Sequence, residues 1–297
     1  LRVMELSVII VSYNVKDYLR ESVRSVIRAS ESIDSEIIIV DNCSDDGSAE
    51  MVSLEFPEVR LIRSDMNEGF AAACNRGILS STGMFILILN PDTLVEPSAL
   101  TTAVSFMKDN PEAGAAGARM TDGEGAFLPE SKRGFPSPLT SFFRFTGLGK
   151  LFPRSSFFNA YYLGNMPDDK RCRADILTGA FMLIRREAID KSGLFDTSFF
   201  MYGEDIDLSW RIVRAGYANY YLADARITHF KGKSAGSDEI AVIRHFYSAM
   251  IIFARKHLSK AWFVPVVAGV NMMLALKLIR VSLRGMVKKL SSYVKKG

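Results

Sequence analysis

Five consecutive apolar residues, Phe85 to Leu89, place the strongest constraint on how this chain folds. An unbroken run of this length, bounded by Gly83 and by Asn90-Pro91, is typical of a strand buried on both faces of a parallel sheet, because half-exposed strands alternate instead. Asp92 follows the run, and ligands of open α/β sheets bind at the carboxyl ends of strands. Asp92 is therefore a candidate to bind a phosphate or a metal ion, although an ordinary Asx or Pro turn also explains this segment.

Two earlier apolar runs end in the same way. Leu6 to Val11 leads into Ser12-Tyr13-Asn14, and Glu36 to Val40 leads into Asp41-Asn42, with helical patterns between the runs. This alternation predicts βαβ units and a mainly parallel sheet flanked by helices, an α/β fold. Asp41 could then accept a hydrogen bond from a pyrimidine N3–H, and a helix that starts near Gly69 could offer backbone N–H groups to phosphate.

Neither a G-x-G-x-x-G fingerprint nor a P-loop is present, which counts against NAD enzymes and P-loop ATPases. Residues 110–172 show little periodicity and are rich in Pro, Gly and aromatic residues. A long aromatic segment of this kind is more often a functional loop than a linker. We expect it to hold the acceptor side of a site and a mobile flap.

A group of carboxylates lies at the start of a predicted helix. Ile206, Trp210 and Val213 have helical spacing, so Glu204 and Asp205 fall in the first turn. Acidic residues there are commonly helix caps. Three carboxylates within four residues after an aromatic run also provide the partly desolvated base that takes a proton from an alcohol.

His229 follows a strand-like segment and precedes Lys231, Gly232, Lys233 and Ser234. His229 is one of three histidines in the sequence, and a histidine taken alone is by default a packing or surface residue. A cationic, flexible loop next to it is nevertheless suited to a diphosphate.

The cysteines Cys43, Cys74 and Cys172 are an odd set without ligand spacing, which indicates a reducing compartment, and the first apolar run is too short for a secretory signal. We therefore expect a cytoplasmic protein. Its formal charge of +4 is unevenly divided, because eleven cationic and no acidic residues follow Glu239, which leaves −7 for the preceding part. This separation predicts an anionic partner for the C-terminal segment.

The apolar stretch Ala261 to Leu276 has sixteen residues with Pro265 inside it, and could span a membrane only if Lys260 and Lys277 snorkel. From Leu276 onward, apolar residues three and four apart oppose cationic ones, the pattern of a basic amphipathic helix. We expect this helical extension to lie on the anionic inner face of the cell membrane, with no nucleic-acid partner. A core-packing helix or a homodimer contact remains the alternative.

The chain resembles the family 2 glycosyltransferases of the GT-A fold, which is Rossmann-like, and among them the bacterial rhamnosyltransferase-like enzymes. The match runs from about residue 6 to residue 234. It rests on seven elements in order: residues 8–14, 40–48 and 67–77, Leu-Asn-Pro-Asp-Thr at 89–93, Thr-Gly-Ala-Phe at 178–181, residues 199–211, and His229.

The resemblance implies a role for each matching residue. Asp92 and His229 would bind Mg²⁺ or Mn²⁺ on the donor diphosphate, with Asn90 in place of the first acid of the family's Asp-X-Asp. Asp205 would be the general base, beside Glu204. The sugar-nucleotide site would comprise Ser12, Tyr13, Asn14, Asp41, Asn42, Asn67, Gly69, Phe70, Asn75, Asn90, Lys231, Lys233 and Ser234.

These roles describe an inverting, metal-dependent glycosyltransferase that moves a sugar to a lipid-linked or oligosaccharide acceptor in bacterial surface polysaccharide synthesis. L-rhamnose from dTDP-rhamnose is the expected donor sugar. The alternatives are a UDP-hexose or UDP-galactofuranose donor, or a catalytically silent homologue that binds nucleotide sugars. The expected domains are residues 1–239, with a nucleotide-binding half at 1–109 and an acceptor half at 110–239, followed by helices at 240–297.

Overall fold

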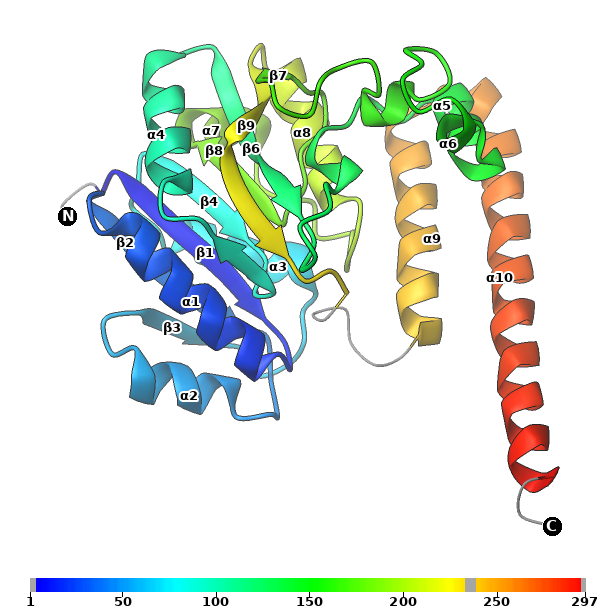
Figure 1. The fold of residues 1–297 in the computed structure, drawn as a ribbon, viewed down its shortest axis with the longest axis horizontal. Coiled ribbons are helices and arrows are strands. Elements are labelled where there is room, and N and C mark those ends of the chain that lie inside the picture. The colour runs from blue at the N-terminus through cyan, green and yellow to red at the C-terminus, as the bar shows by residue number, and fades with distance from the viewer. Residues whose placement is uncertain (1–3, 233–238, 295–297) are drawn as a thin grey trace.

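The computed structural model of the chain describes residues 4–232 and 239–294 and is built around one nine-stranded sheet (Figure 1). The strands are β1 (Leu6–Ser12), β2 (Ser35–Asp41), β3 (Arg60–Arg63), β4 (Phe85–Leu89), β5 (Thr93–Val95), β6 (Ala113–Thr121), β7 (Cys172–Arg173), β8 (Phe181–Arg185) and β9 (Ala218–His229).

The helices connect and cover these strands. They are α1 (Lys16–Ser30), α2 (Ser48–Glu55), α3 (Phe70–Leu79), α4 (Ala99–Asp109), α5 (Pro138–Thr146), α6 (Leu148–Leu151), α7 (Arg186–Ser192), α8 (Glu204–Arg214), α9 (Glu239–His257) and α10 (Lys260–Val294). Two short 3-10 helices, Pro129–Ser131 and Ala160–Tyr162, lie in the long connection between β6 and β7.

The sheet is mixed, and its order is β3-β2-β1-β4-β8-β6-β9-β5, with β7 paired to β9. Strands β3, β2, β1 and β4 are parallel, as the apolar runs predict, whereas β8 is antiparallel to both β4 and β6. The expected α/β fold with helices around the sheet is confirmed.

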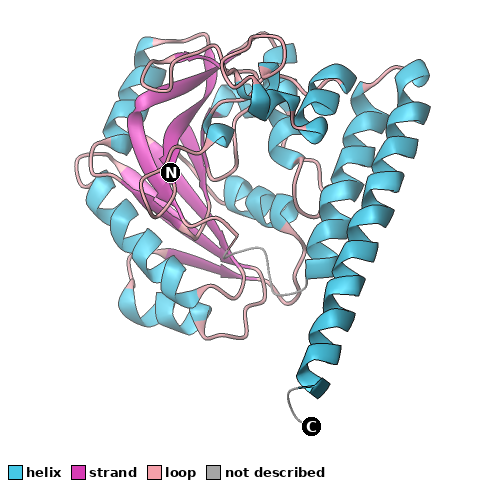
Figure 2. Cartoon of the chain, turned by 45° about the vertical axis from the view of Figure 1, so that its right-hand side comes forward, coloured by secondary structure: helices cyan, strands magenta, loops and turns pink. Residues whose placement is uncertain are grey.

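Two apolar clusters form the core, one on each face of the sheet. The first contains buried residues of α1, α2 and α4, and the second contains buried residues of α3, α7 and α8. Every residue of β4 is buried, because helices cover both of its faces (Figure 2). The unbroken apolar run in the sequence is thus the expected signature of this central position.

The segment 110–172 is more ordered than its sequence suggests. It begins with β6, which occupies an interior place in the sheet between β8 and β9. Further along, Ser137 and Thr140 form a capping box that starts α5, with the Thr140 backbone N–H donating to the Ser137 hydroxyl at 3.1 Å. The expectation of an irregular loop over the whole segment was wrong for β6, whose small residues carry little strand signal.

The chain ends in a hairpin of two long helices, α9 and α10, that stands beside the sheet domain (Figures 1 and 2). Residues Lys260–Leu283 of α10 form a stretch of 24 residues that is long and apolar enough to cross a membrane, and 6% of its most apolar window is buried. The sixteen-residue limit expected from the sequence was too short. Pro265 falls early in α10, and the helix continues through it.

Candidate active site

Three parallel strands end together beside a cleft of about 960 Å³. Ser12 of β1 pairs with Asp41 of β2, and Ile10 of β1 pairs with Leu89 of β4. The polar residues that follow these strands therefore meet at one edge of the sheet, as the sequence predicts.

Most of the residues expected to bind the sugar nucleotide line this cleft. They are Tyr13, Asn14, Asn42, Asn67, Gly69, Phe70, Asn90 and Lys231. Lys233 and Ser234 lie outside the described residues. The cleft thus gathers side chains from β1, β2, β4 and the segment after β9, although these are distant in the sequence.

Ser12, Asp41 and Asn75 are not among the described residues that line the cleft. Ser12 is fully buried. Asp41 Oδ2 accepts a hydrogen bond from the Ser44 backbone at 3.1 Å, whereas its buried Oδ1 has no hydrogen-bond partner among the described residues. Asn75 bonds both the N–H and the C=O of Phe195, at 3.0 and 2.8 Å, so it fastens α3 to the segment before α8.

The turn before α3 is fixed by a small amide network. The Asn42 side chain donates to Asn67 Oδ1 at 2.9 Å, and the same Asn67 oxygen accepts from the Gly69 N–H at 3.0 Å. Gly69 has a φ of +84°, and a Cβ there would lie 2.5 Å from the Phe200 carbonyl oxygen. Only glycine meets both requirements. Because Gly69 has no side chain, the turn can pack directly against the segment before α8.

Asp92 and His229 form a buried pair, of which His229 lines the cleft, whereas Asp92 is not among the described residues that line it. Thr93 of β5 pairs with His229 of β9, and this register brings His229 Nε2 to 3.2 Å from Asp92 Oδ1 and 3.4 Å from Asn90 Nδ2. Asp92 is 1% exposed and His229 is 9% exposed. Among the residues that the structure describes, no group of three or more His, Cys, Asp or Glu side chains is arranged to hold a metal. These two residues can therefore supply part of a coordination shell, which donor phosphates and water would have to complete.

Glu204 and Asp205 begin α8 and both line the cleft. Asp205 Oδ2 accepts a hydrogen bond from the guanidinium of Arg133 at 2.8 Å, and the same nitrogen donates to the Leu177 carbonyl at 2.6 Å. Burial raises the pKa of Glu204 to about 8, and the charge of Asp205 adds to this effect. At neutral pH Glu204 therefore keeps its proton, beside an Asp205 carboxyl that is paired with Arg133.

Two residues of this region were missed by the sequence analysis. Arg133 lies in the segment without periodicity, so no pattern pointed to it. Tyr202 lines the cleft with a φ of +70°, which is rare for a residue other than glycine. Burial raises the pKa of Tyr202, and the charges of Glu204 and Asp92 raise it further. Glu204 and Asp92, which are far apart in the sequence, therefore both lie near the hydroxyl of Tyr202.

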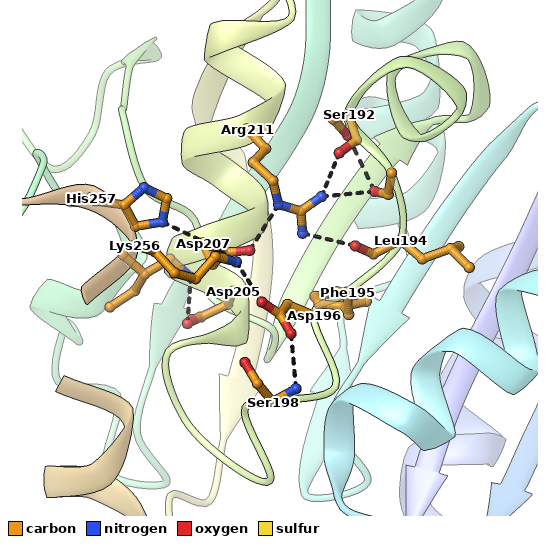
Figure 3. A network of polar contacts seen from close by, with 12 residues as sticks. Ser192, Leu194, Phe195, Asp196, Ser198, Asp205, Asp207, Arg211, Lys256 and His257 are labelled. Carbon is orange, nitrogen blue, oxygen red and sulfur yellow. Dashed lines mark hydrogen bonds and ion pairs between the residues drawn. The ribbon is translucent and has the colours of Figure 1, made fainter. Parts of the chain in front are cut away.

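A third acid of the helix, Asp207, is fully buried and anchors a network of cations (Figure 3). Its carboxylate lies 2.8 Å from Arg211, 2.7 Å from Lys256 and 2.8 Å from His257. Burial alone would raise the pKa of Asp207, but hydrogen bonds from these three side chains hold it well below its usual range. Asp207 therefore binds α9 to α8 rather than facing the cleft.

The helix α9 also forms part of the cleft wall, through Ala241, Val242, His245 and Phe246. The His245 ring stacks on Phe200, with centroids 4.6 Å apart. Although α9 lies beyond the domain boundary expected at residue 239, its side chains face the same space as the acidic pair.

Comparisons with known proteins identify similar sequences and similar folds. The sequence profile of Glycosyl transferase family 2 matches residues 7–193. The chain is 30% identical over 294 residues to an N-acetylglucosaminyl-diphospho-decaprenol L-rhamnosyltransferase of Mycobacterium tuberculosis, and the match covers 94% of both chains.

Solved structures resemble it in fold. A mannosyltransferase from Pyrobaculum calidifontis, in complex with GDP-Man and Mn²⁺, superposes with a TM-score of 0.58 at 17% identity, covering 96% of this chain and 81% of that one. The TarS 1–349 fragment from S. aureus, in complex with UDP-GlcNAc, gives a TM-score of 0.55 at 18% identity, covering 90% and 72%. With the profile match across most of the sheet domain and a relative that is similar along nearly its whole length, the chain belongs to glycosyl transferase family 2.

Proposed function

We propose that this protein transfers L-rhamnose from dTDP-rhamnose to a glycan carried on a polyprenyl diphosphate, with inversion at the anomeric carbon. The observation that carries the proposal is the single cleft that the nucleotide-side residues share with the acidic pair of α8. The choice of donor and acceptor is supported by the whole-length similarity to an enzyme named for rhamnosyl transfer to N-acetylglucosaminyl-diphospho-decaprenol.

The donor nucleotide would lie across the ends of β1, β2 and β4. Asn42 and Asn67 shape the turn that leads into α3, whose first N–H groups would face the phosphates. The buried Oδ1 of Asp41, at the end of β2, would accept a hydrogen bond from the N3–H of thymine. Lys231 adds a positive charge at the edge of the cleft. These groups would fix the sugar with its anomeric carbon toward α8.

Asp205 is the proposed general base. It lies in the cleft, and the guanidinium of Arg133, 2.8 Å away, fixes the orientation of its carboxylate. When the acceptor hydroxyl attacks the face opposite the leaving diphosphate, Asp205 takes the hydroxyl proton, and one displacement inverts the centre. Glu204, which is protonated at neutral pH, serves as a hydrogen-bond donor to bound sugar.

A divalent cation such as Mg²⁺ or Mn²⁺ fits beside the donor diphosphate. Asp92 and His229 would hold it, because a carboxylate oxygen and an imidazole nitrogen 3.2 Å apart suit such ions when phosphate and water complete the shell. When bound, the ion would neutralise charge on the departing diphosphate. Asn90 Nδ2 lies 3.4 Å from His229 Nε2, and this contact would be released when that imidazole nitrogen binds the ion.

The site of action would be the cytoplasmic face of the cell membrane, where a lipid-linked acceptor is presented. The apolar, exposed surface of α10 and the cationic residues of the C-terminal segment support a peripheral attachment to anionic lipid.

The decisive experiment compares dTDP-rhamnose, UDP-glucose and UDP-galactose as ligands and as donors, each with and without Mn²⁺. We expect the largest thermal stabilisation, and transfer to N-acetylglucosaminyl-diphospho-polyprenol, from dTDP-rhamnose with the metal. Chelation by EDTA should abolish the transfer, and the product should carry the inverted anomeric configuration by NMR. A stronger response to a UDP-sugar would replace the donor, and binding without transfer would identify a silent homologue.

A further inference from the structure

The cleft lining also contains residues that the proposed donor site does not use. They are Arg133, Arg144, Tyr161 and Tyr162. Arg133 is already engaged, since it donates to Asp205 and to the Leu177 carbonyl. Arg144 differs, because its charge serves none of the catalytic groups.

The guanidinium of Arg144 is held between aromatic rings. It lies 4.9 Å from the ring centroid of Tyr161, 5.7 Å from that of Tyr162 and 5.8 Å from that of Phe145. Among the described residues Arg144 has no carboxylate partner. Stacking on ring faces leaves the N–H edge of a guanidinium available, and that edge matches the oxygens of a phosphate.

The helix that carries Arg144 also carries an exposed apolar face. Leu139, Phe142 and Phe145, spaced three residues apart on α5, are 49, 56 and 40% exposed. We call the exposed set the aromatic patch, which comprises Leu139, Phe142, Phe145, Leu151, Phe152 and Phe157. Phe143 packs beneath it at 5.1 Å from Phe157 and 5.0 Å from Phe158, so the patch rests on an ordered base. Grouped exposed apolar residues on an ordered base mark a binding surface.

The position of the patch agrees with a lipid ligand. Figure 1 shows α5 and α6 next to the end of the hairpin where α9 gives way to α10, and Figure 2 shows the same neighbours from another side. Trp262 and Val264, in the first turns of α10, are 55 and 68% exposed. The patch therefore lies at the end of the hairpin where α10 begins its apolar stretch.

From Asp205 the contacts lead to Arg133, from Arg133 to Tyr161 and from Tyr161 to Arg144, whose helix carries the aromatic patch. The chemistry therefore runs in the order carboxylate, guanidinium, apolar surface. A polyprenyl-diphosphate-linked glycan has the matching order of hydroxyl, diphosphate and isoprene chain. Resting on the function proposed above, we propose that Arg144 binds the acceptor diphosphate and that the aromatic patch receives the first isoprene units, which directs the acceptor hydroxyl to Asp205. Lys150 and Arg154 follow α5 in the sequence, and both are exposed, so they supply further positive charge.

Binding of farnesyl diphosphate and of inorganic pyrophosphate to the full chain tests this proposal, with saturating dTDP present to occupy the donor site. Arg144→Gln should weaken binding of farnesyl diphosphate by about tenfold or more, and Arg144→Lys by less, because charge remains without the planar fork. The double variant Phe142→Ser/Phe145→Ser should weaken farnesyl diphosphate binding but leave pyrophosphate binding unchanged. Arg63→Gln and Leu54→Ser, which change exposed residues of β3 and α2, are the matched controls.

Equal affinities for farnesyl diphosphate in all variants would overturn the proposal. So would a loss of flotation with phosphatidylglycerol vesicles at unchanged farnesyl diphosphate affinity, which would make the patch a bilayer contact. The binding measurement does not require sugar transfer, so its result tests this proposal independently of the donor assignment. If the variants transfer rhamnose with unchanged KM for the acceptor, this inference alone fails.

Discussion

The imidazole Nε2 of His257 in α9 lies 2.8 Å from Oδ1 of Asp207 in α8. Asp207 is three residues after Glu204, so this contact holds the helix that presents the acidic pair against the C-terminal hairpin. Lys256 strengthens the junction, because it bonds Asp207 at 2.7 Å and Asp196 at 2.5 Å. The helix α9 is therefore a structural part of the proposed catalytic site.

Replacing Asp207 tests this junction. Asp207→Asn leaves Arg211 and Lys256 without the buried charge that they share, and loss of one partner of a buried ion pair typically costs about 3–5 kcal/mol. We expect a loss of this size in the free energy of unfolding, measured with urea. Asp17→Asn is the control, because the Asp17 side chain is 89% exposed and its loss should change stability by less than about 0.5 kcal/mol. Equal stability of the two variants would contradict the structural role of Asp207.

Much of the nucleotide side of the cleft could be predicted from the sequence. Long apolar runs that end in polar residues fix both the strand type and the sheet edge at which those residues meet. For this reason the sequence predicts that Tyr13, Asn42 and Asn90 lie close together, and all three line the cleft. The start of α8 at Glu204 is also predictable, because Ile206, Trp210 and Val213 have helical spacing and Glu204 comes just before them.

The acceptor side was less predictable, because tertiary packing decides it. The strand β6 contains Gly114 and Gly117, and added Cβ atoms there would lie 2.5 Å from Ile212 and 2.9 Å from Leu177. Its small residues are required by close neighbours and carry low strand propensity. Arg133 is bound to Asp205 across 72 positions of sequence, and a contact of that kind has no local pattern.

The stability of the protein should decrease as pH rises through the neutral range. Burial raises the pKa of Glu204 to about 8, with a further contribution from Asp205, whereas the same carboxyl in an unfolded chain has a pKa of about 4.3. Between these values the folded protein keeps a proton that the unfolded chain has lost. The free energy of unfolding therefore falls with rising pH, by at most about 1.4 kcal/mol per pH unit for this group.

Urea unfolding at a series of pH values between about 5 and about 8 measures this slope. Glu204→Gln has no proton to lose, so the variant should show a flatter dependence over the same window. Its stability relative to the native protein should improve as the pH increases. An identical slope in both proteins would show that Glu204 is ionised in the folded state.

The two acids of α8 should differ in their effect on the reaction. Asp205→Asn removes the proposed base and should lower kcat by about 10²–10⁴-fold. Glu204→Gln resembles the protonated form that burial favours, and should lower kcat by less than about tenfold at neutral pH. Thermal stabilisation by the donor should persist in both variants and serves as the control for folding. The reverse order of the two effects would assign the base to Glu204.

Two truncations separate the roles of the C-terminal helices. Removal of residues 260–297 deletes α10 and leaves Lys256 and His257 on Asp207, so donor binding should persist while flotation with anionic vesicles is lost. Removal of residues 240–297 also deletes the part of the cleft wall that α9 forms and the two α9 partners of Asp207, Lys256 and His257, and leaves Arg211 in place. Because that loss uncovers a buried carboxylate beside the acidic pair, we expect a marked fall in melting temperature and loss of donor binding. Vesicle flotation that survives deletion of α10 would show that the anchor lies elsewhere, and full donor binding without α9 would show that the catalytic helix keeps its place unaided.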